Sequence, residues 1–125
     1  MPAYDRAFNP PAPVADVIVA NPVSRNKRSV LRGKMDTGAD ITVIPGKLVG
    51  PLGLRPQSRV WTRGYDGTYA QRPVYYVRLT VEGFVLPTVR CIATDRTEVL
   101  LGRNVMNHYL IILDGQRLSF ELKNS

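Results

Sequence analysis

Asp36, Thr37, Gly38, Ala39 and Asp40 form the stretch of this 125-residue chain whose residue types are best suited to chemistry. An Asp on a tight Thr-Gly turn is held rigidly, because the Thr hydroxyl can anchor the turn by hydrogen bonds and the Gly lets a ligand backbone come close. A carboxylate held in this way is a candidate general acid or base. The same tripeptide is also an ordinary turn in many proteins, so the surrounding elements must decide between the two interpretations.

Two strand-like runs would position this turn. Residues 29–35 precede Asp36 and residues 41–45 follow it, and both are apolar enough for strands. Further along the chain, a short apolar run at 98–102 leads into the one credible helix, residues 103–109. We therefore expect the turn to be held between paired strands, with a short helix following the third run.

A β-hairpin is predicted between these segments. Residues 59–62 and 69–71 flank the turn residues Gly64, Tyr65, Asp66 and Gly67, whose composition is typical of a hairpin tip. The second arm of this hairpin continues past Pro73 into a long strand at 74–81. The remaining predicted elements are a strand at 14–19, a short turn or single helical coil within 45–54, a strand at 84–93, and a final hairpin of 110–113 with 117–122 across Asp114-Gly115. The sequence thus predicts an all-β fold with one short C-terminal helix.

Length and composition bound the organisation of the chain. Residues 1–13 are proline-rich and predict an extended N-terminal arm, and residues 14–125 predict one domain large enough for its own core. The single cysteine, Cys91, excludes an internal disulfide and a zinc cluster, so we expect neither a metal nor a cofactor. Because no signal-peptide core or membrane span is visible, we expect a cytoplasmic protein with no membrane partner.

The chain is basic, with a formal net charge of +7. Its Arg residues are scattered, and the only cluster, residues 25–28, falls where a turn is expected. We find no basic surface interleaved with aromatic residues in the sequence pattern, so nucleic acid is not an expected partner.

The joint order of Asp-Thr-Gly, a glycine-tipped hairpin and Leu-Leu-Gly-Arg-Asn at residues 100–104 resembles the retropepsin-like aspartic proteases. The resemblance covers about residues 14–122 and is strongest to stand-alone bacterial members, although the Asp36 and Gly102 motifs are also similar to those of retroviral proteases. It implies a closed β-barrel of the retropepsin, or pepsin-lobe, type with a flap hairpin.

The resemblance implies a role for each residue of the first motif. Asp36 would be the catalytic carboxylate, and Thr37 would lie beneath it and bond to its twin across a subunit boundary. Gly38 would accept a hydrogen bond from the substrate backbone, and Ala39 and Asp40 would help to hold the peptide.

The resemblance also assigns the later motifs. Residues 64–67 would form the flap tip that closes over the substrate. Arg103 would pair with Asp40, because a guanidinium fork suits a carboxylate at a partly buried position, and Gly102 and Asn104 would support the site.

Hydrolysis of a peptide bond by this route needs two carboxylates that share one proton. The chain contains a single Asp-Thr-Gly, so a homodimer with Asp36 of each subunit at the two-fold axis is the economical arrangement. The resemblance therefore implies a homodimeric aspartic endopeptidase that acts on polypeptides.

Lys34 departs from the family pattern, which places an apolar residue two positions before the catalytic Asp. Strand alternation would send Lys34 and Asp36 to the same side. The lysine could then select acidic substrate side chains, or keep both carboxylates ionised and weaken catalysis, or extend to solvent. The second of these options leaves an alternative function, a catalytically weak or inactive retropepsin-like binding or dimerisation module.

Overall fold

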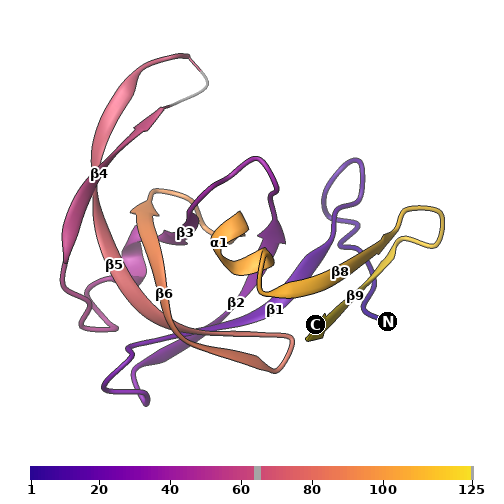
Figure 1. Ribbon diagram of the computed structural model, residues 1–125, viewed down its shortest axis with the longest axis horizontal. Helices are drawn as coiled ribbons and strands as arrows, with labels where there is room; N and C mark the ends of the chain where they lie inside the picture. The colour runs from indigo at the N-terminus through magenta and orange to yellow at the C-terminus, as the bar shows by residue number, and fades with distance from the viewer. Residues whose placement is uncertain (64–65, 125) are drawn as a thin grey trace.

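The computed structural model describes residues 1–63 and 66–124. Nine β-strands, a 3-10 turn and a four-residue α-helix form within these residues, and loops connect them (Figure 1). The elements in chain order are β1 (Val14–Ala20), β2 (Arg28–Met35), β3 (Thr42–Pro45), η1 (Gly46–Leu48), β4 (Ser58–Arg63), β5 (Tyr69–Val81), β6 (Phe84–Thr94), β7 (Val99–Leu101), α1 (Arg103–Met106), β8 (Tyr109–Asp114) and β9 (Ser119–Asn124). Short apolar runs that end at Gly, Pro or Asp-Gly produce this succession of strands.

Six of the strands close into a barrel. Their order is β1-β2-β7-β3-β6-β5, and β5 pairs back with β1, so the sheet has no free edge at the seam. Strand residues that alternate inward form the core, including the fully buried Val17, Ile44, Val77, Leu79 and Leu101. The prediction of an all-β closed barrel with one short C-terminal helix is confirmed.

Strands β4 and β5 form the predicted hairpin, and it extends beyond the barrel (Figure 1). β4 is at the end of the strand order and pairs with β5 alone, from Ser58 opposite Val74 to Arg63 opposite Tyr69. Of the predicted tip, Asp66 and Gly67 are described, whereas Gly64 and Tyr65 lie outside the described residues. One face of this hairpin overhangs the end of the barrel where β2 stops (Figure 1).

Two segments differ from the predicted structure. The helix ends at Met106 rather than at residue 109, because Tyr109 already pairs with Asn124 at the start of the β8–β9 hairpin. The N-terminal arm is not extended throughout: a bridge between Asp5 and Ala12 closes it into a loop. Its first residues lie against β9, where the Tyr4 ring centroid is 6.5 Å from that of Phe120.

Cys91 is fully buried on β6 and is a free thiol. Burial raises the pKa of this thiol from 9.0 to about 12, so it stays protonated and acts as a small apolar side chain. No helix within the described ranges is long and apolar enough to cross a membrane.

Candidate active site

The turn after β2 fixes the Asp36 carboxylate through backbone hydrogen bonds. The Asp36 N–H donates to the Leu101 carbonyl at 3.0 Å, which ties the turn to β7. The Gly38 N–H then donates to Asp36 Oδ1 at 2.9 Å, and the Ala39 N–H donates to the Asp36 carbonyl at 3.2 Å. The carboxylate therefore has one oxygen held by the turn and a position set by the barrel.

Gly102 lies directly against the chain that leaves this turn. A Cβ at Gly102 would be 2.6 Å from the Ile41 carbonyl carbon and 2.9 Å from the Thr42 nitrogen, both of which are backbone atoms. Only glycine allows so close an approach. The structure thus brings together residues 36–42 and 100–104, the two segments that the sequence singled out.

A hydrogen-bond network centred on the buried Thr42 joins these segments to each other. The Thr42 N–H and hydroxyl donate to Asn104 Oδ1 at 3.0 and 2.8 Å, and the Gly102 N–H donates to Thr42 Oγ1 at 3.1 Å. Asn104 Nδ2 donates to the Arg90 carbonyl on β6 at 2.8 Å. Sequence reasoning missed Thr42, although a threonine within the apolar run 41–45 is a signal for a polar group that needs an internal partner.

Arg103 contacts the backbone carbonyl groups of the turn rather than the Asp40 side chain. Its guanidinium donates to the Thr37 carbonyl at 2.7 Å, and its N–H donates to the Ala39 carbonyl at 2.8 Å. Asp40 is exposed, and none of the ion pairs between described residues joins it to Arg103. The predicted Asp40–Arg103 pair is therefore wrong for the single chain, because the first residue of α1 lies beneath the carbonyl groups of the turn.

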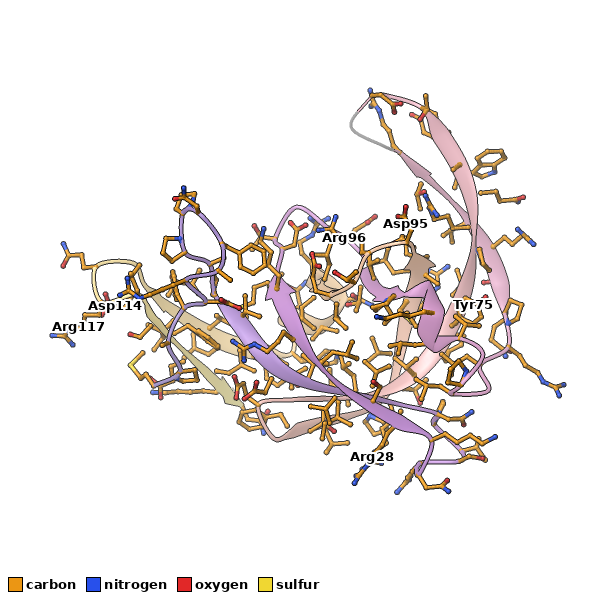
Figure 2. All side chains as sticks on the ribbon, turned by 180° about the vertical axis from the view of Figure 1, so that it is seen from behind. Arg28, Tyr75, Asp95, Arg96, Asp114 and Arg117 are labelled. Atoms are coloured by element: carbon orange, nitrogen blue, oxygen red, sulfur yellow. The ribbon has the colours of Figure 1, made fainter. Side chains whose placement is uncertain are left out.

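The open side of Asp36 faces a cavity of about 610 Å³, here called the Asp36 cavity. The β2–β3 turn, the inner face of the β4–β5 hairpin, an apolar floor and the β6–β7 loop surround it. Its lining residues are Asp36, Gly38, Ala39, Val43, Thr62, Arg63, Thr68, Ala70, Arg72, Ile92, Thr94, Asp95, Arg96 and Leu100. Figure 2 shows Asp95 and Arg96 on the side of the molecule from which the hairpin rises.

Several predicted site residues lie outside this lining. Thr37 and Asp40 are exposed, and Asp66 and Gly67 occupy the described part of the hairpin tip without lining the cavity. Hydrogen bonds from the Thr68 hydroxyl and N–H hold the pKa of the exposed Asp66 carboxyl below its usual 3.8. These bonds fold the chain tightly just after the tip.

Lys34 does not line the Asp36 cavity. Its Nζ lies 4.8 Å from the centroid of the Phe8 ring, and its backbone is opposite Val14 on β1. The ammonium is therefore held by a cation–π contact against the N-terminal loop. Sequence reasoning missed Phe8 because it treated residues 1–13 as an arm outside the domain.

Charged residues of both signs line the Asp36 cavity, and arginines are in excess: Arg63, Arg72 and Arg96 face Asp36 and Asp95. Arg96 is ion-paired with Glu98, with 3.0 Å between Nη2 and Oε1. Burial works against ionisation of Glu98, but hydrogen bonds from Arg96 and Thr97 outweigh it and hold its pKa below 4.5. Sequence reasoning missed the arginines, although the hairpin register alone would have placed Arg72 on one face with Thr62.

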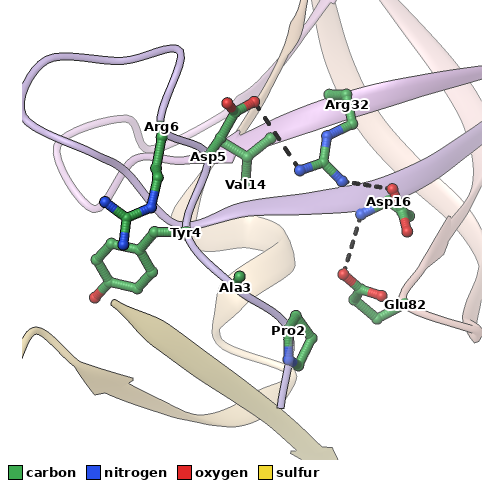
Figure 3. Close-up of a pocket in the computed structure, with 9 residues that line it drawn as sticks. All are labelled: Pro2, Ala3, Tyr4, Asp5, Arg6, Val14, Asp16, Arg32 and Glu82. Atoms are coloured by element: carbon green, nitrogen blue, oxygen red, sulfur yellow. Dashed lines mark hydrogen bonds and ion pairs between the residues drawn. The ribbon is translucent and has the colours of Figure 1, made fainter. Parts of the chain in front are cut away.

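A second cavity, of about 720 Å³, lies under the N-terminal segment and is here called the N-terminal cavity. The Arg32 guanidinium contacts the carboxylates of Asp5 and Asp16 there, and Glu82 accepts a hydrogen bond from the Asp16 N–H at 3.1 Å (Figure 3). Three of the charged residues that line this cavity, Asp5, Asp16 and Arg32, are thus paired with one another.

The chemistry that the Asp36 cavity can support is proton transfer by a fixed carboxylate beside a space large enough for part of a peptide. Nowhere in residues 1–63 and 66–124 do three His, Cys, Asp or Glu side chains gather so that they could hold a metal ion.

Comparisons with known proteins identify a family and a fold for this chain. The sequence profile of a family described as aspartyl protease matches residues 21–105. The fold is similar to the Simian Foamy Virus (mac) protease, with a TM-score of 0.57 and 20% identity over 76% of this chain and 92% of that one. It is also similar to the EIAV protease, solved with the inhibitor HBY-793, with a TM-score of 0.56 and 19% identity over 77% and 86% of the two chains.

A bacterial structure is similar over most of both chains. The retropepsin-like aspartic protease from Rickettsia conorii has a TM-score of 0.52 and 16% identity over 82% of this chain and 87% of that one. At these identities the structural likeness shows the fold, which is the retropepsin-like barrel. No curated protein matches the sequence.

Proposed function

Because this chain belongs to the aspartyl protease family, we propose that it is a homodimeric aspartic endopeptidase in which two Asp36 carboxylates, one from each subunit, activate water against a peptide bond. The observation that carries this proposal is the fixed Asp36 carboxylate on the wall of the Asp36 cavity, with Gly38 donating to one oxygen and Leu101 accepting from its N–H. No other carboxylate that lines this cavity is held in a comparable way among the described residues.

The reaction follows from two like charges at short range. Two adjacent carboxylates share one proton, because both cannot ionise cheaply a few ångströms apart. The ionised carboxylate takes a proton from water, whose oxygen attacks the carbonyl carbon, and the protonated carboxylate donates its proton to the carbonyl oxygen. The C–N bond of the resulting gem-diol then breaks: the carboxylate that took the proton from water gives it to the leaving nitrogen, and the other carboxylate takes a proton from a gem-diol hydroxyl, which restores the shared-proton pair.

The second carboxylate is assigned to another copy of the chain. Asp95 also lines the cavity, but it is exposed, and no hydrogen bond or ion pair to its carboxylate is formed with the described residues, so nothing fixes it for proton transfer. Strand β8 exposes 51% of Leu110 and 40% of Ile112, which share one face of the strand and form an apolar surface that a second copy would cover. A two-fold dimer of this kind would place Thr37 of each subunit beneath the paired carboxylates.

The substrate class is an extended polypeptide. The cavity separates a strand hairpin from an apolar floor of Val43, Ile92 and Leu100, a space that suits a peptide bound as an added strand. The Gly38 carbonyl would accept a hydrogen bond from the peptide backbone, Ala39 and Asp40 would help to hold it, and residues 64–67 would close over it.

The test is peptide cleavage by Asp36→Asn beside the wild-type protein, with sedimentation of both. We expect the wild type to cleave members of a peptide library as a dimer, and Asp36→Asn to lose about 10³-fold or more of kcat/KM while remaining dimeric. Asp95→Asn should retain most of the activity. Undiminished cleavage by Asp36→Asn, or equal losses in both variants, would overturn the proposal.

The alternative of an inactive binding module rested on Lys34, whose ammonium the structure places against Phe8 and outside the lining of the cavity. Lys34→Leu separates the two functions. If the endopeptidase proposal holds, Lys34→Leu changes cleavage little. If the wild type is inactive and Lys34→Leu gains Asp36-dependent cleavage, Lys34 suppresses the activity and the alternative function holds for the wild type.

A further inference from the structure

Arg72 lies on the inner face of the β4–β5 hairpin. In the hairpin register Val60 is opposite Arg72 and Thr62 is opposite Ala70, so these four side chains share one face. Three of them, Thr62, Ala70 and Arg72, line the Asp36 cavity. Arg72 is partly buried, and it lines the same cavity as Asp36, Gly38 and Ala39 of the β2–β3 turn.

The three arginines of the cavity differ in the interaction partners of their guanidinium groups. Arg96 is ion-paired with Glu98, and the Arg63 guanidinium carbon lies 5.9 Å from the Tyr69 ring centroid. Arg72 makes no ion pair or side-chain hydrogen bond with any described residue. A partly buried arginine whose five N–H donors have no partner among the described residues offers a planar fork that matches a carboxylate.

An apolar surface adjoins this cation. Val43, Ile92 and Leu100 line the floor and belong to one cluster with Val74, which is two residues from Arg72 on the same face of β5. Two residues along a strand span about 6.7 Å, which is also the spacing of same-side side chains in an extended peptide. A bound peptide can therefore present an apolar side chain to the floor and an acidic one to Arg72.

We propose that Arg72 is a specificity-determining residue that selects peptide substrates with an acidic side chain within two residues of an apolar one. This inference rests on the proposed function, and it assigns to Arg72 the selection of acidic side chains that the sequence suggested for Lys34. The two carboxylates of the cavity do not pair with Arg72: Asp36 is assigned to proton transfer, and Asp95 lies on the exposed β6–β7 loop. The Arg72 guanidinium can therefore bind a carboxylate of the substrate.

The test compares matched peptides that differ only by Glu or Gln at one position near an apolar residue. We expect the wild type to cleave the best Glu peptide about tenfold faster, in kcat/KM, than its Gln partner, the size of one charge-assisted hydrogen bond. Arg72→Gln should bring this ratio to about one, and Arg72→Glu should invert it in favour of Lys peptides. Arg59→Gln is the matched control, because Arg59 is exposed on the other face of the same hairpin.

A binding measurement keeps this inference separate from catalysis. Fluorescent Glu and Gln peptides are titrated into Asp36→Asn and into the double variant Asp36→Asn, Arg72→Gln. Tighter binding of Glu peptides that disappears in the double variant supports the inference even if the wild type cleaves nothing, an outcome that overturns only the proposed function. Equal cleavage and equal binding of both peptides, or the same loss in Arg59→Gln, would overturn the role of Arg72.

Discussion

The Asp36 cavity and the N-terminal cavity contain the same charged residue types in different arrangements. In the N-terminal cavity Arg32 contacts both Asp5 and Asp16, and Glu82 is bonded to the backbone (Figure 3). In the Asp36 cavity only Arg96 has a carboxylate partner, and Arg72 has none among the residues that the structure describes. Side chains that form ion pairs with each other connect segments of the chain, whereas a charged side chain without an ion pair can bind a ligand.

The two regions also differ in how their backbones are held. The segment that contains the Asp36 turn is attached to the segment from Gly102 to Asn104 by hydrogen bonds of the buried Thr42 side chain and by the close approach of Gly102. The N-terminal segment is attached by ion pairs that are largely in solvent, since the side chains of Arg32 and Asp16 are 47% and 71% exposed. Buried hydrogen bonds lose more when broken than exposed ion pairs do, so the two regions should respond differently to mutation.

The largest expected difference concerns Gly102→Ala. The added Cβ would collide with backbone atoms of Ile41 and Thr42, and we expect the free energy of unfolding to fall by about 3 kcal/mol. Gly50→Ala is the control, because its Cβ would meet nothing within 4 Å, and its effect should stay within about 0.5 kcal/mol. Urea denaturation of both variants measures the free energy of unfolding, and equal midpoints would contradict the close contact of Gly102 with the backbone of Ile41 and Thr42.

Thr42→Val should have the next largest effect. It removes the hydroxyl that donates to Asn104 and accepts from Gly102, and leaves these buried groups without that partner. We expect a loss of about 2 kcal/mol in the free energy of unfolding, measured by thermal and chemical denaturation. Thr62→Val, which removes an exposed 3.3 Å hydrogen bond to the Ala70 carbonyl, should cost clearly less.

Arg32→Gln should cost no more than about 1 kcal/mol, although it breaks two ion pairs of the N-terminal cavity. The difference from wild type should shrink further when salt is added, because these charges are screened by solvent ions. Denaturation at low and high ionic strength measures this. If Arg32→Gln lowered the free energy of unfolding more than Thr42→Val does, the inferred difference in stability between the two regions would be wrong.

The smallest effect is a pH dependence at the edge of the Asp36 cavity, where Arg96 lines the cavity and pairs with Glu98. The pKa of Glu98 is held below 4.5, so the ionised carboxylate stabilises the folded state above that pH, and this contribution fades as the pH falls through the lowered pKa. NMR titration of the Glu98 side chain should give a midpoint below 4.5 in the wild type. In Arg96→Gln the midpoint should rise, because burial then acts with less opposition; an unchanged midpoint would show that Arg96 does not hold Glu98.

Much of the barrel follows from local sequence patterns. Residues 59–62 and 69–71 alternate in the way that a hairpin requires, and β4 and β5 form there. The helix after Gly102 was predicted too long, because pairing of Tyr109 with Asn124 competes with helical bonds and wins. The N-terminal loop was predicted as extended, because proline content reports local backbone restriction and not the Asp5–Ala12 bridge that closes the loop.

The sequence by itself determined the turn that carries Asp36 and the succession of strands and hairpin that follows it, because turn chemistry and alternation act over a few neighbouring residues. Only the tertiary structure decided that Thr42 bonds to Asn104, that Lys34 lies against Phe8 and that Arg72 faces the cavity. These contacts join residues far apart in the chain. Their formation depends on barrel closure and strand register, which no local pattern specifies.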